Sequence, residues 1–524
     1  MRLACSSPRL IFAISLTLIA ATAAIFTTGC GSGSMSKTPP LTGNTQVTMV
    51  LTSTANDQLA AFDLVLQSIS LTGQSGKTVS LLSVPQGLEF IHLNGHVDPV
   101  ATVSIPQDIY TSASASIGGA QFTCVTLTPD GGLYSDTYAY GYTPAPNVTV
   151  SLPSPITATG DHMSLSLDLL VSQSANYPSC YIAGGTIPTY SITPTFNLSP
   201  ATFSSSSANE EAGKVAQLDG QITAIGAAGD TFTLADGFGF PQSLSITTGS
   251  DTVYQGVSGF SALAAGTFVD MDSTIQSDGS LLATRIAVED PSAVQVQIGP
   301  LMYSSAAEPA LVLWGQQQLG TGVDAIGGQY FSYGSATFQV SGQLTNLQNL
   351  PFTPNFSASN MVAGQNVYLT ADTLVISRGF PYTPASSVTL IPQTIDGVVT
   401  ASSTSGGFND YSVTLAAYDL FPTLAVQQGQ ATLLSNPNTV EVYVDSNTQM
   451  LNSQPIVPGN TLRFYGLVFN DNGTLRMDCA QVSDGVDFTV LPTASQQAHK
   501  GSIHTLADSA GSARQTVNVI TPPN

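Results

Sequence analysis

Short apolar segments dominate the chain after Cys30, and their spacing is typical of β-strands. Alternating or β-branched runs recur roughly every 8–12 residues, separated by Gly, Asp, Asn and Pro turns. Examples are residues 47–51, 79–82, 148–152, 231–234, 367–369 and 440–444. Helical periodicity is nearly absent, so the pattern predicts an all-β fold of sandwiches or barrels.

The chain divides where this periodicity is interrupted. At 524 residues it is too long for one core, and the breaks are rich in Gly, Ser, Thr and Pro. We expect a signal peptide at 1–29, a flexible tether at 30–44, a β-sandwich domain at 45–200, a linker at 201–213, β-barrel repeats at 214–292, 293–390 (degenerate) and 391–490, and a mobile tail at 491–524.

Two similar units point to an internal repeat after residue 213. Leu218-Asp219-Gly220 opens one unit and Ile395-Asp396-Gly397 opens the other, each before a Thr-rich strand. Both close with a Gly-led strand and a second strand that follows an Asp-Gly or Asn-Gly turn, dipeptides that suit tight hairpins. A degenerate middle copy has its Gly-led strand at 363–369. About three small OB-like β-barrel modules are therefore expected behind the N-terminal β-sandwich.

Two families resemble parts of this chain. Residues 45–200 resemble an uncharacterised domain family of bacterial envelope lipoproteins, through residues 47–51, Phe62 to Leu71, Ile105-Pro106 to Tyr110, Leu165 to Asp168 and Ile192-Thr-Pro194. The repeats are similar to a second uncharacterised family, built on Asp-Gly-x-Val/Ile and a Gly-led strand before a Gly hairpin. Both resemblances imply structural modules, and neither implies a catalytic residue.

The N-terminus has the layout of an export signal. Arg2 and Arg9 precede an apolar, uncharged run at 10–26, and Thr27-Thr-Gly-Cys30 follows. This order indicates a bacterial lipobox, in which Cys30 is lipidated and becomes the mature N-terminus. An uncleaved anchor and a soluble product cleaved after Ala23 or Ala24 remain the alternatives.

The low content of charged residues and the negative net charge limit the kinds of partner that the chain is expected to bind. Only 8% of the residues are charged and the net charge is −22; a nucleic acid would require clusters of Lys or Arg. We therefore expect no nucleic-acid partner. Membrane attachment is expected through the N-terminal lipid and not through a basic patch.

Cysteine usage fits an exported protein. Cys124 and Cys180 fall in one predicted domain and form a possible disulfide, whereas Cys479 reads as a buried apolar residue.

Candidate chemistry is sparse. His92, Asn94, His96 and Asp98 would share one face of a strand but lack a further ligand, and the Gly73 to Thr78 segment reads as a hairpin turn although it is similar to a phosphate loop. Asp270 and Asp272 would share a strand face, which we expect to be solvated. Trp314, with Tyr303 and Tyr330, could form a sugar platform or pack in a core.

These observations favour a non-enzymatic, lipid-anchored cell-envelope protein with a structural or binding role, located at the outer membrane. No catalytic residue, metal or cofactor is expected. Envelope polysaccharide or another envelope protein is the expected partner. The alternative is a carbohydrate-binding or carbohydrate-processing accessory lipoprotein.

Overall fold

The computed structural model describes residues 41–483 apart from internal gaps. The longer gaps are 54–58, 128–132, 140–146, 177–190, 204–212, 237–242, 290–294, 320–326, 342–346 and 423–432. The predicted signal peptide, residues 30–40 of the tether and the tail therefore lie outside the described residues. In the part described, no helix has the length and apolarity needed to cross a membrane.

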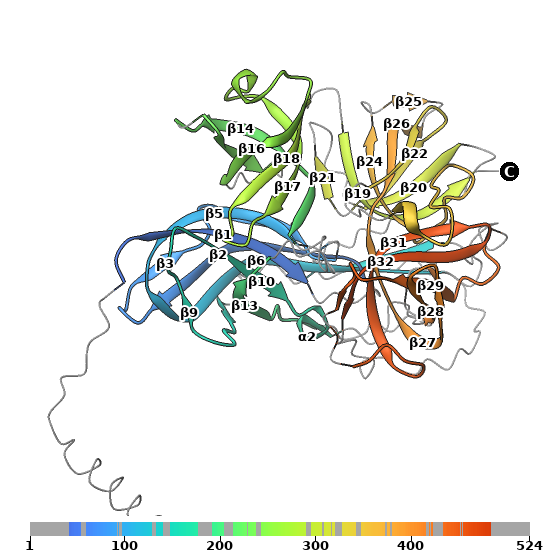
Figure 1. The fold of residues 1–524 in the computed structure, drawn as a ribbon, viewed down its shortest axis with the longest axis horizontal. Helices are drawn as coiled ribbons and strands as arrows, with labels where there is room; N and C mark the ends of the chain where they lie inside the picture. Colours follow the sequence, from blue (N-terminus) through green and yellow to red (C-terminus); the bar gives the residue numbers. More distant parts are fainter. Residues whose placement is uncertain are drawn as a thin grey trace, which may run out of the picture. The chain divides into compact units, whose positions relative to one another are not determined.

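The expected all-β fold class is confirmed (Figure 1). The helical elements among the described residues are α2 (Val171–Ser174), two helical residues at Phe421 and Pro422, and two 3-10 turns, η1 (Phe260–Ala262) and η2 (Leu347–Asn349). All other regular structure in this part of the chain consists of strands, as the short alternating runs predict.

Two sheets form the N-terminal β-sandwich. The first sheet has the order β13-β10-β1-β5, and its β1–β10 pair is parallel. Its strands are β1 (Asn44–Ser53), β5 (Asp98–Pro106), β10 (His162–Leu169) and β13 (Phe196–Ala201). The second sheet has the order β3-β2-β6-β7. In addition, β4 pairs with β2, and β8 and β9 both pair with β6. Its strands are β2 (Leu59–Gly73), β3 (Thr78–Ser80), β4 (Gln86–Glu89), β6 (Ile109–Leu127), β7 (Leu133–Ala139), β8 (Asn147–Val150) and β9 (Ile156–Thr157). A separate short pair joins β11 (Ala175–Asn176) to β12 (Ser191–Ile192).

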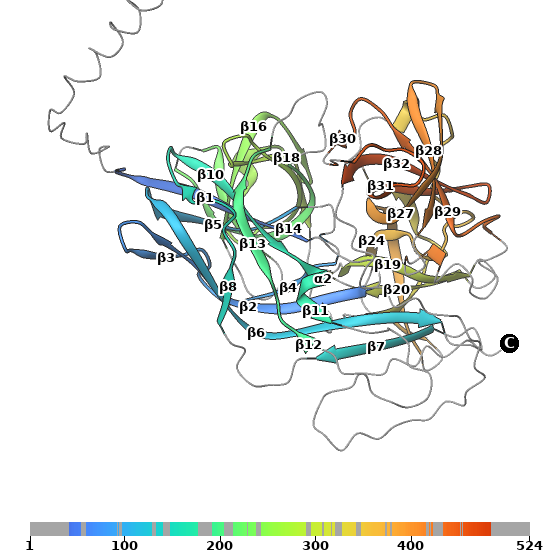
Figure 2. The same ribbon diagram turned by 90° about the horizontal axis from the view of Figure 1, so that it is seen from below.

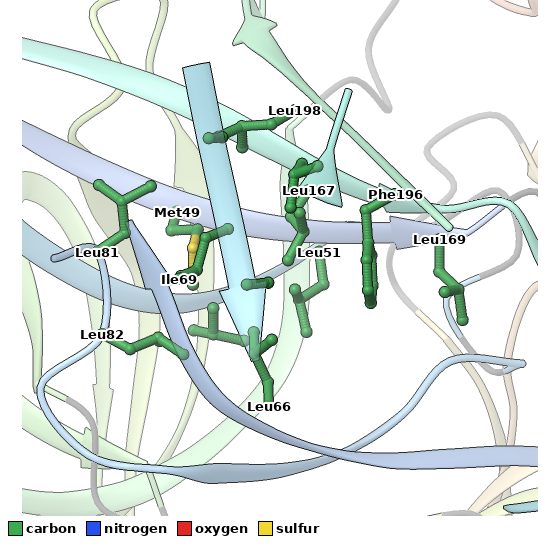
Figure 3. Packing of buried hydrophobic residues seen from close by; sticks show 14 of the residues in the cluster. Met49, Leu51, Leu66, Ile69, Leu81, Leu82, Leu167, Leu169, Phe196 and Leu198 are labelled. Atoms are coloured by element: carbon green, nitrogen blue, oxygen red, sulfur yellow. The ribbon is translucent and has the colours of Figure 1, made fainter. Parts of the chain in front are cut away.

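Alternation along the strands builds the core between these two sheets. Figure 2 shows β2, β6 and β7 as long neighbouring strands of the second sheet. Met49 and Leu51 of β1 and Leu167 of β10 share one buried cluster with Leu66 and Ile69 of β2 (Figure 3). Burying both inner faces removes apolar surface from water, which is the main term favouring the sandwich.

Residues 214–289 form a closed five-stranded barrel, the first module. Its ring order is β14-β15-β16-β18-β17, with the third and fifth strands parallel and all other neighbours antiparallel. This is the pattern of a small OB-type barrel. Its strands are β14 (Lys214–Ile225), β15 (Thr231–Asp236), β16 (Ser243–Gln255), β17 (Phe268–Ile275) and β18 (Leu281–Glu289).

The second and third modules repeat this ring order. In the second module the ring is β19-β20-β22-β26-β24, made of β19 (Gln295–Ser305), β20 (Ala310–Gly315), β22 (Gly327–Ser332), β24 (Asn366–Ala371) and β26 (Phe380–Leu390). The additional strands are β21 (Gln317–Leu319), β23 (Thr337–Val340) and β25 (Val375–Ser377). In the third module the ring is β27-β28-β29-β32-β31, made of β27 (Gln393–Ser405), β28 (Phe408–Leu415), β29 (Thr439–Val444), β31 (Thr461–Asp471) and β32 (Thr474–Ser483), with β30 (Gln449–Met450) on β32. The parallel closing pairs are β22–β26 and β29–β32.

Equivalent hydrogen bonds align the three modules residue by residue. The amide of Gly266 donates to the carbonyl of Ile222 in the first module; Gly364 donates to Leu301 in the second, and Gly459 to Val399 in the third. The three glycines have φ values of 94°, 99° and 97°, a region that residues with a Cβ rarely enter. The Gly-led strand of the repeat is therefore one structural device used three times.

A threonine hydroxyl bridges the parallel closing pair in the first and third modules. Thr252 Oγ1 donates to the carbonyl of Ala283 over 2.7 Å, and Thr448 Oγ1 donates to that of Cys479 over 2.7 Å. Each hydroxyl also accepts an amide hydrogen three residues earlier, from Gly249 or from Asp445. The side chain thus satisfies backbone groups where the ladder between the two parallel strands is interrupted.

The two closing hairpins differ in turn geometry, although the sequence predicts the same tight turn for both. Asn472 and Gly473 both have positive φ, 51° and 93°, as a two-residue turn requires. At the Asp278-Gly279 turn only Gly279 has positive φ, and Gln276 donates its amide hydrogen to the carbonyl of Ser280. This turn is therefore a three-residue loop that ends in a left-handed glycine, so the expected turn is wrong there.

A close backbone approach at Gly220 gives a first prediction. A Cβ at this position would lie 2.3 Å from the carbonyl oxygen of Ala235, whereas one at Gly249 in the same barrel would meet only Leu282 Cδ1 at 3.5 Å. We expect Gly220→Ala to lower the free energy of unfolding by about 1–3 kcal/mol and Gly249→Ala to change it by less than about 0.5 kcal/mol. Urea unfolding with hydrogen exchange of residues 214–289 measures both, and equal effects of the two variants would contradict the assignment.

Candidate functional site

The three modules carry residues of different charge at one equivalent position. It lies where the opening strand pairs with the fourth strand, three residues before the carbonyl that accepts from the Gly-led strand. The facing residues are Asp219 and Asp270 in the first module, Ile298 and Tyr368 in the second, and Asp396 and Arg463 in the third. We call this the strand-1/strand-4 position.

In the third module this position holds a bidentate ion pair. Arg463 donates from Nε to Asp396 Oδ1 over 2.8 Å and from a terminal nitrogen to Oδ2 over 2.9 Å. The two side chains are 11% and 1% exposed. Two parallel charge-assisted bonds compensate the desolvation of the buried carboxylate.

In the first module two carboxylates face each other at the same position. Asp219 is 2% and Asp270 8% exposed. The cation comes from the fifth strand, because Arg285 on β18 donates to Asp270 Oδ2 over 2.5 Å and from Nε to Asp272 Oδ2 over 2.7 Å. The shared face of Asp270 and Asp272 is as predicted, but the expected solvation is wrong for Asp270. Arg285 bridges both acids, and Asp270 is buried.

Burial dominates the electrostatics of this acidic group. It raises the pKa of Glu289 on β18 to about 7, and the charge of Asp270 adds to that rise while Arg285 opposes it. Burial likewise raises the pKa of Asp270, against the charge of Arg285. Burial alone would lower the pKa of Arg285, but its bonds and charge contacts with Asp272 and Asp270 raise it, so Arg285 stays charged.

A tyrosine of the second module interacts electrostatically with the same acids. Tyr368 on β24 is 4% exposed, and burial raises its pKa above the usual value. The charges of Asp219, Asp270 and Glu289 raise it further, and that of Arg285 lowers it. The group can therefore hold protons. In the described part of the chain, no set of His, Cys, Asp and Glu side chains has a geometry that could hold a metal ion.

A second carboxyl pair lies on the third module and was not expected from the sequence pattern. Glu441 on β29 has a raised pKa, caused first by burial and then by the charge of, and a hydrogen bond with, Asp410 on β28. Ser403 Oγ donates to Asp410 Oδ2 over 3.2 Å. The two acids lie diagonally across the β28–β29 ladder, since Asp410 faces Tyr443 and Glu441 faces Ser412. Only the strand register could have revealed this pair.

Other residues considered from the sequence fall in two groups. Cys30, Cys180, His92, Asn94, His96 and the side chain of Cys124 lie outside the described residues, so the possible disulfide and the lipid site stay predictions. Cys479 is free and 4% exposed, as predicted, and burial raises its pKa.

The structure also decides the expectations for Trp314 and for the turn at Gly73 to Thr78. Trp314 is 6% exposed and packs with Met302 and Val312, so it is a core residue and not an open sugar platform. Gly73 and Lys77 close the hairpin between β2 and β3 through the Gly73 amide, which confirms the predicted turn.

The buried ion pair of the third module gives a second prediction. Arg463→Met leaves the Asp396 carboxylate buried without its cation, so the free energy of unfolding should fall by about 3–5 kcal/mol. The double variant Asp396→Leu/Arg463→Met removes both charges and should recover most of that loss. Urea unfolding compares them, and a single variant as stable as the wild type would show that the pair contributes nothing.

Comparison with known proteins places one module in a family. No curated protein and no solved structure matches the chain. Residues 219–287 match the model of a family described as a domain of unknown function, DUF5666. The matched segment begins at Asp219 and ends near the close of β18, so it covers most of the first barrel. The chain therefore carries a DUF5666 domain at residues 219–287.

Proposed function

We propose that this chain is a non-enzymatic, lipid-anchored cell-envelope protein with a structural or binding role, fixed to the outer membrane through Cys30. The leader supports the anchor, because Arg2 and Arg9, an apolar run and a small-residue stretch precede Cys30. The lipid is the membrane contact in this proposal. No cofactor, metal or nucleic acid takes part.

The observation that carries the structural role is the threefold ring order behind the sandwich. Three modules with one strand order stand in tandem from residue 214 to residue 483. Two buried ion pairs form within single barrels, Arg463 with Asp396 and Arg285 with Asp270. Such tandem modules suit a spacer or display device, because repeats of one strand order can be added along a chain and stabilise one another through contacts between neighbours.

A hydroxyl-rich face on the sandwich supports the choice of a neutral envelope polysaccharide as partner. On the outer side of β2, β3 and β6, hydroxyl groups pair across strands: Ser68 with Ser116 at 2.6 Å, Ser70 with Ser114 at 3.0 Å and Thr72 with Thr78 at 3.0 Å. Each pair keeps free lone pairs for a hydroxylated polymer. This face is the observation that favours the second candidate function, a carbohydrate-binding accessory lipoprotein.

The anchor is tested by lipid labelling. Cells that make the wild-type chain with labelled palmitate should yield a labelled product, and Cys30→Ala should abolish the label because the acceptor thiol is gone. Cys5→Ala, a matched change inside the leader, should keep the label. A Cys30→Ala product that still incorporates palmitate would overturn the lipid assignment.

The polysaccharide is tested with the purified mature chain and insoluble envelope polysaccharide. Ser70→Ala/Ser114→Ala removes one cross-strand hydroxyl pair and should weaken cosedimentation about fivefold, the equivalent of roughly 1 kcal/mol. Thr231→Ala/Thr247→Ala removes a facing hydroxyl pair on the first module and should leave binding unchanged. Equal binding by all variants would remove this face from the proposal, and release of soluble sugars would overturn the non-enzymatic role.

A further inference from the structure

We propose that the strand-1/strand-4 position of the first module is a proton-binding site. Proton binding there makes the folded first barrel more stable as the surroundings become mildly acidic. The inference goes beyond the proposed anchoring and binding role, and it does not depend on that role. It rests on Asp219 facing Asp270 and on Asp270, Asp272 and Glu289 lying near the guanidinium of Arg285.

The geometry sets like charges against each other. Asp219 and Asp270 are directly facing residues of the antiparallel β14–β17 pair, and both are more than nine-tenths buried. Directly facing like charges destabilise a sheet, and low polarity around them strengthens the repulsion. A proton on one of the two acids removes most of that cost, because a neutral carboxyl group does not repel its neighbour.

Asp270 also has an oxygen that nothing in the described chain satisfies. Its Oδ2 accepts from Arg285, whereas its Oδ1 is buried and accepts no hydrogen bond from any described group. A buried acceptor without a donor is costly. Protonation at Oδ1 would neutralise the carboxyl group and replace the orphaned acceptor with a donor.

The strands around Asp270 carry more acidic than basic side chains. β14 contributes Asp219, β17 contributes Asp270 and Asp272, and β18 contributes Arg285 and Glu289. From β24 the group is faced by Tyr368, which is a neutral phenol because its pKa is raised well above the usual value. Asp270, Asp272 and Glu289 thus lie near the guanidinium of Arg285, and Asp219 faces Asp270.

The other two modules are balanced at the same position. The third places Arg463 against Asp396, and the second places Tyr368 against Ile298. The first module alone among the three carries two acids there, with its cation on a different strand. This difference indicates a property specific to the first module.

The direction of the pH dependence follows from linkage. The pKa values of Asp270 and Glu289 are raised in the folded barrel, that of Glu289 from 4.5 to about 7. Between these two values the folded state binds more protons than the unfolded state, so stability falls as the pH rises. The added stability is fully present below the unfolded pKa and is lost as the pH passes the folded pKa.

Hydrogen exchange of the full mature chain tests the proposal. We expect the protection factors of amides in β17 and β18, corrected for intrinsic exchange, to fall by up to about tenfold per pH unit between pH 5 and pH 7.5, the limit for one linked proton. Asp270→Asn should flatten this dependence and raise protection at pH 7.5. Asp251→Asn, an exposed acid of the same barrel, should keep the wild-type dependence.

The outcomes separate the alternatives. A flat wild-type profile, or an unchanged slope in Asp270→Asn, would overturn the proposal. If Asp270→Asn fails to fold, Glu289→Gln tests the same group, and a wild-type slope in that variant would overturn it as well. An equal loss of slope in Asp251→Asn would assign the effect to the overall negative charge of the chain.

Discussion

The parallel pairing of the third and fifth strands is the contact on which each module depends. Four antiparallel neighbours bring the chain around, but only β16–β18, β22–β26 or β29–β32 closes the ring. Closure removes the open sheet edges and encloses the apolar core, as with Leu244 and Ile246 in the first barrel. Thr252 and Thr448 act at this closing pair, where a side chain replaces an interrupted ladder.

Charge placement is the second constraint, and it follows from closure. Residues on the outer face of a closed five-stranded ring can be covered by neighbouring elements. An acid on the opening strand can therefore be buried although it points away from the barrel core. Asp396 is buried in this way and is paired by Arg463 from the facing strand. In the first module the facing residue is Asp270, and Arg285 supplies the cation from another strand.

Much of the fold could be predicted from local pattern. The alternation of Ser68 to Thr72 predicts an outward hydroxyl and inward apolar face, and the Asp219 and Asp396 motifs identify two modules before any pairing is known. The middle module is harder to recognise, because Ile298 replaces the acid and only the Gly364 strand resembles the others. Its ring order nevertheless matches.

The candidate site could be predicted only in part. Asp270 and Asp272 lie two residues apart, so their shared face follows from strand geometry alone. Their bond to Arg285, the burial of Asp270 and the pairing of Asp410 with Glu441 depend on strand register and on contacts far apart in the chain. No local spacing contains that information.

The different residues at the strand-1/strand-4 position also give correct and exchanged strand pairings different charge balances. Tandem modules with a common ring order can exchange equivalent strands, a typical misfolding route of repeat proteins. If the first and third modules exchanged fourth strands, Arg463 would meet Asp219, but Asp270 would lie against Asp396 with two buried carboxylates and no guanidinium between them. An exchange between the second and third modules would bury Arg463 against Ile298. The residues that differ between these barrels thus disfavour the exchange of equivalent strands between neighbouring modules.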